Sequence, residues 1–399
     1  MLGKRILFAW ELGANLGHLA RDLPVAEQLR ELGHDVTFAV RDLRVAQQVL
    51  APRSFNFFQA PRVSTSGSRE RPPVNYSGIL LASGYDDDLS LAGSVSAWAA
   101  LFEAAQPSAV VINHAPTAVL AARALEIPAA ITCIGFELPP SVDPLPSIRP
   151  WDRSSIDELC KSDAAVLKNI NTVLQQYSKT PLHHVTDMFS GLPAVLTTFP
   201  ELDHYGGRTN ARYVGPLSAL PATAEAEWPL SEGKRIFAYL RPSVPGFEHL
   251  LTALQESGAS ILCVAPGVSE EDARRVTSPR FKVLIHPVSL DKALRHADLA
   301  VVYGSGTMSD ALLAGVPLLM VPQVVEQLLV AGRIEELGAG LLWRAPRTVE
   351  NAKATVKKAL EDPNLLAAAR AFALRHQGFS PEAAVNSVVE VICSVIAKQ

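Results

Sequence analysis

A short turn of small residues separates a strand-like apolar run from a helix-like segment in the last third of the chain. Its residues are Gly304, Ser305, Gly306 and Thr307. A strand that ends in glycines and enters a helix leaves backbone amides at the positive end of the helix dipole, where an anion binds well. The two glycines let a bulky anion approach, and the Thr307 hydroxyl adds a donor. On spacing alone, the turn predicts either a phosphate cradle or a plain tight turn before a capped helix.

Two further polar residues, Arg241 and Ser243, follow the apolar run IFAYL. The carboxyl ends of strands in doubly wound sheets often contact ligands. An arginine there could bind a phosphate directly, with Ser243 close by. A surface role for Arg241 fits the pattern equally well, so both interpretations stay open.

Neither of two metal-like clusters supports a metal site. The acidic run from Asp86 to Asp88 stands directly before a helix-like segment, so capping and dipole compensation explain it better than a metal-binding DxD motif. The pair His183 and His184 lacks partner ligands at the usual spacing and is expected to be solvated or structural. We expect no metal and no cofactor, and the absence of a GxGxxG loop argues against a nicotinamide dinucleotide.

The elements that must position these residues follow from the hydrophobic pattern. A buried strand over 5–11, a helix over 19–32 and a strand over 35–40 form one βαβ unit, and this order recurs along the chain. The pattern predicts an α/β protein with two facing, Rossmann-like, doubly wound domains and a central cleft. The predicted parts are a first domain over 1–217, a linker over 218–234, a second domain over 235–380 and a C-terminal helix over 381–399. The region 52–88 is expected to be a long irregular loop.

Composition excludes several classes of protein. The chain has 399 residues, of which 48% are hydrophobic and 19% charged, with a net charge of -4. There is no basic surface for a nucleic acid partner. No apolar stretch reaches the roughly 18 residues of a transmembrane helix, and four scattered cysteines suggest a reducing compartment. We expect a cytoplasmic protein; peripheral membrane contact and the oligomeric state stay open.

The segment YGSGTMSDALLAGVPLLMVPQVVEQ resembles the donor-binding signature of the UDP-glycosyltransferase superfamily, especially its bacterial macrolide-glycosyltransferase-like members. That signature reads His-Gly-Gly-x-Gly-Thr, then an acidic residue, Ala-Leu, Gly-Val-Pro, and Asp/Glu-Gln after a strand and a proline. The matching residues are Gly304, Gly306, Thr307, Asp310, Ala311, Leu312, Gly315, Val316, Pro317, Pro322, Glu326 and Gln327. Gly17-His18 and the later segment GHDVTF are similar to the opening of these proteins, so the resemblance covers most of the chain.

The resemblance implies the GT-B fold and an inverting, metal-independent hexosyltransferase-like enzyme. A nucleotide-diphosphate sugar would place its diphosphate at Gly304 to Thr307, and Glu326 and Gln327 would bind the sugar hydroxyls. His18 would be the general base for a hydroxyl of a small-molecule or lipid-like acceptor, as in natural-product or glycolipid biosynthesis. A neutral imidazole suits that work. The alternative for His18 is a helix-start residue bonded to nearby backbone.

Two positions depart from the family pattern. Val302 stands where the family has a phosphate-contacting histidine, and Tyr303 replaces the first glycine, so Tyr303 could offer a hydroxyl and Arg241 a compensating charge. Asn113 stands where an aspartate often orients the base. In serine-protease triads the equivalent exchange of Asp for Asn lowers the rate by orders of magnitude. Two alternatives therefore remain: a catalytically impaired relative that acts as a binding or partner protein, and a GT-B sugar-nucleotide epimerase.

Overall fold

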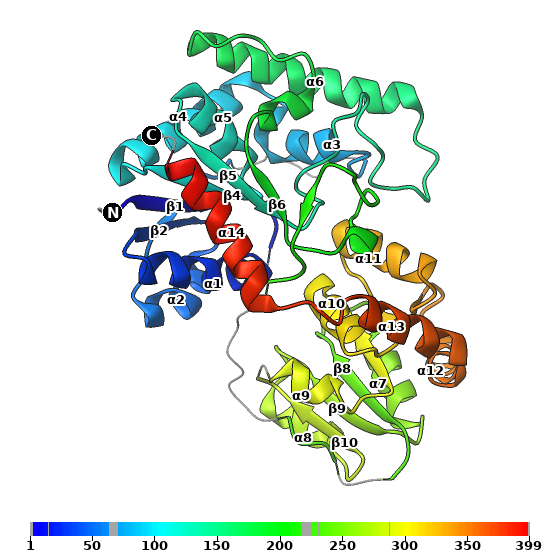
Figure 1. The fold of residues 1–399 in the computed structure, drawn as a ribbon. Helices are drawn as coiled ribbons and strands as arrows, with labels where there is room; N and C mark the ends of the chain where they lie inside the picture. Colours follow the sequence, from blue (N-terminus) through cyan, green and yellow to red (C-terminus); the bar gives the residue numbers. More distant parts are fainter. Residues whose placement is uncertain are drawn as a thin grey trace. The chain divides into compact units, whose positions relative to one another are not determined.

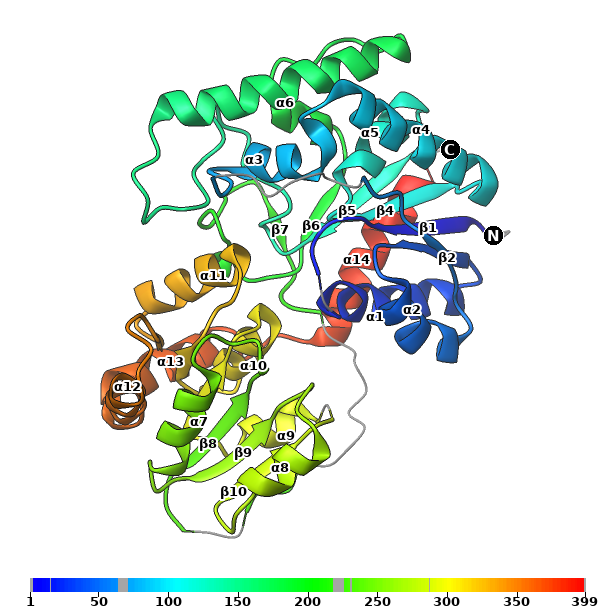
Figure 2. The ribbon, with the colours of Figure 1, turned by 180° about the vertical axis from the view of Figure 1, so that it is seen from behind.

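The computed structural model describes residues 3–14, 16–63, 71–217, 226–229, 232–286 and 288–397 (Figures 1 and 2). The chain divides into two units. The first unit is made of Met1–Ala219 and Ser380–Gln399, and the second unit is Leu220–Phe379. Each unit is described below on its own.

A seven-stranded parallel sheet forms the centre of the first unit, in the order β3-β2-β1-β4-β5-β6-β7. The strands are β1 (Arg5–Trp10), β2 (Asp35–Val40), β3 (Asn56–Gln59), β4 (Ala109–Asn113), β5 (Ala129–Cys133), β6 (Ala194–Leu196) and β7 (Arg212–Tyr213). The central strands are nearly continuous apolar runs because helices cover both faces of a parallel sheet. All five residues of β4 and of β5 are buried.

Helices flank this sheet on both faces. They are α1 (Gly17–Glu31), α2 (Leu43–Val49), α3 (Tyr76–Leu80), α4 (Asp88–Ala105), α5 (Pro116–Ala124), α6 (Ile156–Gln176) and α14 (Pro381–Ile396). Shorter helical turns are η1 (Ala51–Arg53), η2 (Leu81–Tyr85), η3 (Val185–Phe189) and η4 (Pro200–Leu202). Figure 1 shows α1, α2 and α14 on one face and α4 and α5 on the other. The helix α14 packs against α1, β4 and β5, so it completes the first unit.

A six-stranded parallel sheet forms the second unit, in the order β10-β9-β8-β11-β12-β13. The strands are β8 (Arg235–Tyr239), β9 (Ser260–Val264), β10 (Phe281–Leu284), β11 (Leu299–Val302), β12 (Leu318–Met320) and β13 (Gly340–Leu342). The helices are α7 (Phe247–Gln255), α8 (Glu270–Val276), α9 (Leu290–Leu294), α10 (Ser305–Leu313), α11 (Val325–Glu336), α12 (Val349–Glu361) and α13 (Pro363–Arg375). The helices α7 and α12 pack on each other beside the core of this unit.

Each sheet has one topological switch point, where the strand order reverses. In the first unit it lies between β1 and β4, and in the second unit between β8 and β11. Ligands of doubly wound sheets bind outside the carboxyl ends of the strands at such points. The fold therefore directs attention to the loops after these four strands.

The structure corrects one expectation about the chain and supports two others. The region 52–88 is not a continuous irregular loop, because it contains β3 and α3, and Tyr76 and Tyr85 are fully buried. Its central stretch 64–70 and most of the predicted linker over 218–234 lie outside the described residues. The acidic run caps a helix as predicted, since the Asp87 side chain accepts from the Ser90 amide. His184 is the N-cap residue of η3, its backbone amide donates to the Asp187 carboxylate, and its ring lies 3.4 Å from an Asp143 oxygen, which is the expected structural role.

Two smaller observations complete the fold. All four cysteines are free. Among the described residues, none of the helices combines the length and the apolar composition needed to cross a membrane.

Candidate active site

At the switch point of the first unit, Asn113 holds His18 in one orientation. Asn113 ends β4, and His18 lies in the first turn of α1. The Asn113 Nδ2 group donates to Asp22 Oδ2 at 2.7 Å and to the His18 backbone oxygen at 3.1 Å, so Asn113 Oδ1 faces His18 Nδ1 at 2.9 Å. Because an amide oxygen can only accept, Nδ1 carries the hydrogen and the lone pair is on Nε2. In this tautomer the unprotonated ring nitrogen of His18 is Nε2.

A buried ion pair between Arg21 and Glu137 contacts both Asn113 and His18. Arg21 Nη2 lies 3.3 Å from Glu137 Oε1, and the two side chains are only 6% and 4% exposed. Arg21 also donates to Asn113 Oδ1 and lies 3.4 Å from His18 Nδ1. The second Glu137 oxygen accepts from the Ile134 amide at 2.7 Å. Removing one partner of a buried pair leaves an uncompensated charge, so Arg21 and Glu137 depend on each other.

Burial and neighbouring charges set the protonation states here. Burial, and then the charge of Arg21, lower the pKa of His18 to about 4, so the imidazole is neutral at pH 7. Burial raises the pKa of Asp22 to about 7, although Arg21 and Asn113 oppose the rise. Burial also disfavours the Glu137 carboxylate, but Arg21 and the two nearby histidines outweigh it and lower its pKa to about 2.

Close packing fixes the His18 ring. Its centroid lies 5.1 Å from the Trp10 ring at an angle of 20°, and 6.0 Å from the His114 ring. Gly13 lies against the ring with a φ of 82°, and a Cβ added there would be 2.3 Å from His18 Nε2. Glycine is required at this position both for its backbone conformation and for the space beside Nε2.

In the second unit, the glycine turn opens a helix as predicted. Gly304 is the N-cap residue of α10, and no side chain caps its first turn. The φ of Gly304 is -92°, and a Cβ added at Gly304 or Gly306 meets no atom within 4 Å. Neither the backbone conformation nor internal packing requires a glycine at either position. The uncapped amides of Gly306 and Thr307 are suited to an anion.

Two residues near the glycine turn differ in what they could offer a phosphate. The Val302 side chain has no polar group, whereas Arg241 carries a positive charge. Val302 is fully buried in β11 and pairs with Tyr239 and Met320. Tyr303 is 7% exposed and stacks on Tyr239, with ring centroids 6.1 Å apart. The Arg241 guanidinium lies 5.7 Å from the Tyr303 ring, so it is beside the glycine turn. Burial raises the pKa of Tyr303 to about 12, so its phenol stays neutral.

The remaining predicted donor residues have hydrogen-bond partners within the second unit. Ser305 Oγ donates to Glu326 Oε1 at 2.5 Å, which joins the start of α10 to α11. Gln327 is 7% exposed, and its side-chain oxygen accepts from the Gln323 amide at 2.9 Å. Ser243 Oγ donates to the Gln323 side-chain oxygen at 3.1 Å. The loops after β8, β11 and β12 therefore come together at the switch point of this unit.

Sequence reasoning assigned no role to four further residues of this cluster in the first unit. Arg21 and Asp22 stand three and four positions after His18, which places all three on one face of a helix. His114 and Glu137 follow the ends of β4 and β5. Helical spacing and strand ends were the signals that could have found them.

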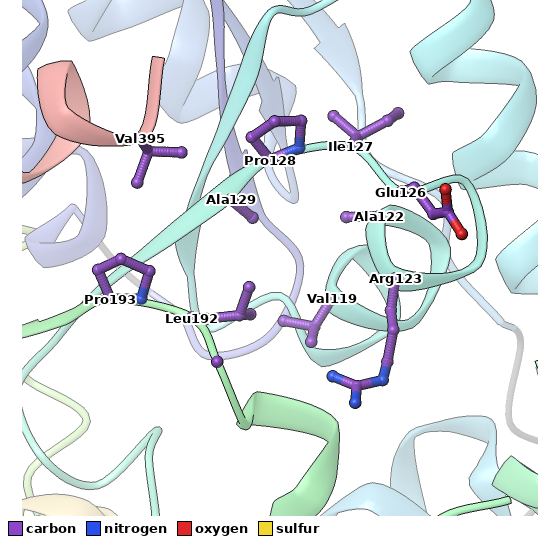
Figure 3. Close-up of a pocket in the computed structure, with 11 residues that line it drawn as sticks. Val119, Ala122, Arg123, Glu126, Ile127, Pro128, Ala129, Leu192, Pro193 and Val395 are labelled. Atoms are coloured by element: carbon purple, nitrogen blue, oxygen red, sulfur yellow. The ribbon is translucent and has the colours of Figure 1, made fainter. Parts of the chain in front are cut away.

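A surface hollow of about 310 Å³ lies away from both switch points (Figure 3). It is lined by Val119 and Arg123 of α5, the start of β5 and the loop at Leu192 and Pro193. These residues lie at the amino ends of β5 and β6. Because Asn113 ends a parallel strand of the same sheet, the hollow is at the opposite edge and contributes nothing to the His18 site.

Two doubly wound units in one chain, each with its candidate residues at the switch point, are the architecture of GT-B glycosyltransferases. Solved structures confirm this fold. The calicheamicin glycosyltransferase CalG4 matches with a TM-score of 0.70 and 19% identity over 99% of this chain and 100% of that chain. The spinosyn rhamnosyltransferase SpnG matches with a TM-score of 0.66 and 17% identity over 97% and 99% of the two chains.

The chain is also similar in sequence to a glycosyltransferase of PGL/p-HBAD biosynthesis from Mycobacterium tuberculosis. The two are 26% identical over 215 residues, which are 52% of this chain and 48% of the relative. The chain thus spans about half the length of the curated relatives that it matches first. No protein-family model matches it. The resemblance predicted from the sequence is confirmed at the level of fold and related sequences.

Proposed function

We propose that the protein is an inverting glycosyltransferase that moves a sugar from a nucleotide-diphosphate sugar to a hydroxyl of a small-molecule or lipid-like acceptor, without a metal cofactor. The acceptor proton goes to His18 Nε2, and the acceptor oxygen bonds to the anomeric carbon from the face opposite the diphosphate. The bond from that carbon to the diphosphate oxygen breaks, and the diphosphate leaves. One observation carries the proposal: the Asn113 amide fixes the His18 tautomer in which Nε2 is basic.

The second unit supplies what the leaving group needs. The uncapped first turn of α10 offers amides to the charge that develops on the diphosphate. Arg241 beside the turn would add a cation in place of the histidine that Val302 replaces. SpnG has been solved with thymidine diphosphate and with spinosyn aglycone, which supports a nucleoside diphosphate donor and an aglycone-like acceptor here.

The test is release of free nucleoside diphosphate. The protein is mixed with UDP- and dTDP-sugars, with and without a panel of hydroxylated acceptors, and the diphosphate is measured. We expect release only when donor and acceptor are both present. Conversion of the donor without an acceptor would instead indicate an epimerase.

The second candidate is a catalytically impaired GT-B relative that binds a sugar nucleotide without turnover. Two observations favour it: Val302 is buried, and Arg21 lies 3.4 Å from His18 Nδ1, where it disfavours the imidazolium. A thermal shift with nucleoside diphosphates but no release with any acceptor would support this candidate, because ligands of the native state raise its stability.

Asp22 supplies the negative charge that Asn113 lacks, although it bonds to Asn113 and not to His18 itself. Since Asn113 Nδ2 donates to Asp22 Oδ2 while Oδ1 faces the imidazole, the amide connects a carboxylate to His18. We expect Asp22→Asn to lower kcat by about tenfold, because general-base assistance as a whole is worth about 10²–10⁴. The double variant Asp22→Asn with Asn113→Asp moves the charge next to His18 and should restore most of the activity. Steady-state kinetics decides, and a double variant no better than Asp22→Asn alone would contradict this role.

The pH dependence should show two steps. The pKa of Asp22 is raised to about 7, so its carboxylate becomes neutral as the pH falls through 7, and kcat/KM should fall there by the factor that Asp22→Asn costs. The pKa of His18 is lowered to about 4, so the base itself is lost only below that pH, with a tenfold fall per pH unit. Asp22→Asn should remove the step near 7. Glu11→Gln is the matched control, because burial also raises the pKa of Glu11 to about 7 but Glu11 bonds to Thr117; loss of the step in this variant would contradict the assignment.

A further inference from the structure

Several buried polar atoms around the His18 site have no hydrogen-bond partner in the described part of the chain; one is Arg21 Nε, and two belong to neutral side chains. These two are His114 Nε2 and the Tyr76 hydroxyl, and the two residues are 7% and 1% exposed. Nearly all buried polar groups in native proteins are paired, so each exception requires an explanation. Leaving such a group unpaired costs stability, which a ligand or water can restore.

The rings that carry the two groups are neighbours. The Tyr76 and His114 rings have centroids 6.1 Å apart. The negative charge of the Glu137 carboxylate acts to raise the pKa of both side chains. His114 lies 6.0 Å from His18, ring centroid to centroid. A Cβ added at Gly13 would lie 2.3 Å from His18 Nε2 and 3.4 Å from His114 Nδ1, so these two ring nitrogens border the space that Gly13 leaves.

The backbone of His114 adds an independent observation. Its φ is 47°, in the left-handed region that favours glycine. Such a conformation in a residue other than glycine costs stability and is common where function requires it. A residue that served only to fill the core at the end of β4 would need neither this backbone nor an imidazole.

A metal ion explains these features less well than an uncharged ligand does. One potential ligand atom each of His18, His114 and Glu137 lies within 4.8 Å of the others. However, both Glu137 oxygens already have partners, and the Arg21 guanidinium would repel a cation. Burial lowers the pKa of His114 to about 4 and raises that of Tyr76, so both side chains are neutral. Their partner should be neutral too.

We propose that His114 and Tyr76 form a subsite that hydrogen-bonds a second oxygen of the acceptor, on the carbon next to the hydroxyl that His18 deprotonates. This subsite rests on the proposed function. The acceptor class is an uncharged vicinal diol or a catechol, since Tyr76 and Phe136 give the subsite aromatic neighbours. The imidazole can donate or accept and the phenol can donate, which suits a hydroxyl or ether oxygen.

The test compares the binding of catechol with that of phenol, by ligand-observed NMR titration without a donor. The wild type should bind catechol about tenfold more tightly, because phenol leaves the two groups unpaired. Tyr76→Phe and His114→Gly should bring the ratio of the two Kd values close to one with little change for phenol. Equal affinities in the wild type, no binding of either compound, or an unchanged ratio in both variants would overturn the subsite.

Thermal unfolding separates this role from a structural one. Since the Tyr76 hydroxyl has no partner among the residues that the structure describes, Tyr76→Phe should leave Tm unchanged or raise it. The matched control is Tyr85→Phe, because the Tyr85 hydroxyl lies 3.1 Å from Thr117 Oγ1. Tyr85→Phe should lower Tm and keep the catechol preference. A fall in Tm for Tyr76→Phe as large as for Tyr85→Phe would count against the subsite.

The proposed function and the subsite can fail separately. Catechol preference without any sugar transfer would refute the glycosyltransferase activity and keep the subsite. Transfer to phenol and catechol with equal Kd and kcat/KM would keep the activity and refute the subsite.

Discussion

His18→Ala should lower kcat/KM for sugar transfer by about 10²–10⁴ while the Kd for the nucleoside diphosphate stays unchanged. The reason is that His18 belongs to the first unit and the glycine turn to the second unit, so the variant removes the base without touching the predicted donor residues. Rates from diphosphate release and Kd from calorimetry measure the two effects. The remaining activity should no longer depend on Asp22, because Asp22 acts through His18.

The control for this variant is His183→Ala. His183 is exposed, and its backbone amide rather than its ring bonds to Asp187. It should keep full activity. If His18→Ala retained the wild-type rate with every active acceptor, the base would have to be another group and the proposed mechanism would be wrong.

Gly306→Val should weaken donor binding strongly without unfolding the protein. A Cβ at Gly306 meets no atom within 4 Å, and the residue does not need a positive φ, so the fold accepts the side chain. The added methyl groups would instead occupy the space of the diphosphate. Overpacking of this kind costs about 1–3 kcal/mol, which corresponds to a roughly ten- to hundredfold rise in Kd. Calorimetric titration with UDP and dTDP measures it.

Gly332→Val provides the comparison for the glycine turn. Gly332 lies within α11, and a Cβ there also meets no atom within 4 Å. This variant should bind nucleoside diphosphates like the wild type and have a similar Tm to Gly306→Val. Equal binding by both variants would show that the turn of α10 is not the diphosphate site.

The fold could be predicted because its signals are local. Apolar runs such as β4 and β5 are buried on both faces, and this continuous pattern marks a parallel strand. The region 52–88 was misjudged because Tyr76 and Tyr85 stand apart, beyond a stretch rich in serine, arginine and proline. Their burial depends on packing against α4 and α6, which lie further along the chain.

The candidate site could be predicted only in part. The resemblance to the UDP-glycosyltransferase superfamily pointed to His18 and Asn113, and the structure brings them within hydrogen-bonding distance. The sequence could not reveal Glu137, which stands 116 positions from Arg21 and meets it only because β1, β4 and β5 are adjacent in the sheet. Nor could it show that Val302 points into the core, since that depends on the register of β11 between β8 and β12.

The position of α14 has a consequence for biosynthesis. This helix is translated after the entire second unit, yet its apolar residues Val388 and Ile392 are buried in the first unit, beside α1 and β5. Domains generally fold as units while the chain leaves the ribosome. The first unit therefore emerges first but is completed last, and until then the surface that α14 covers is exposed to chaperones and to other nascent chains.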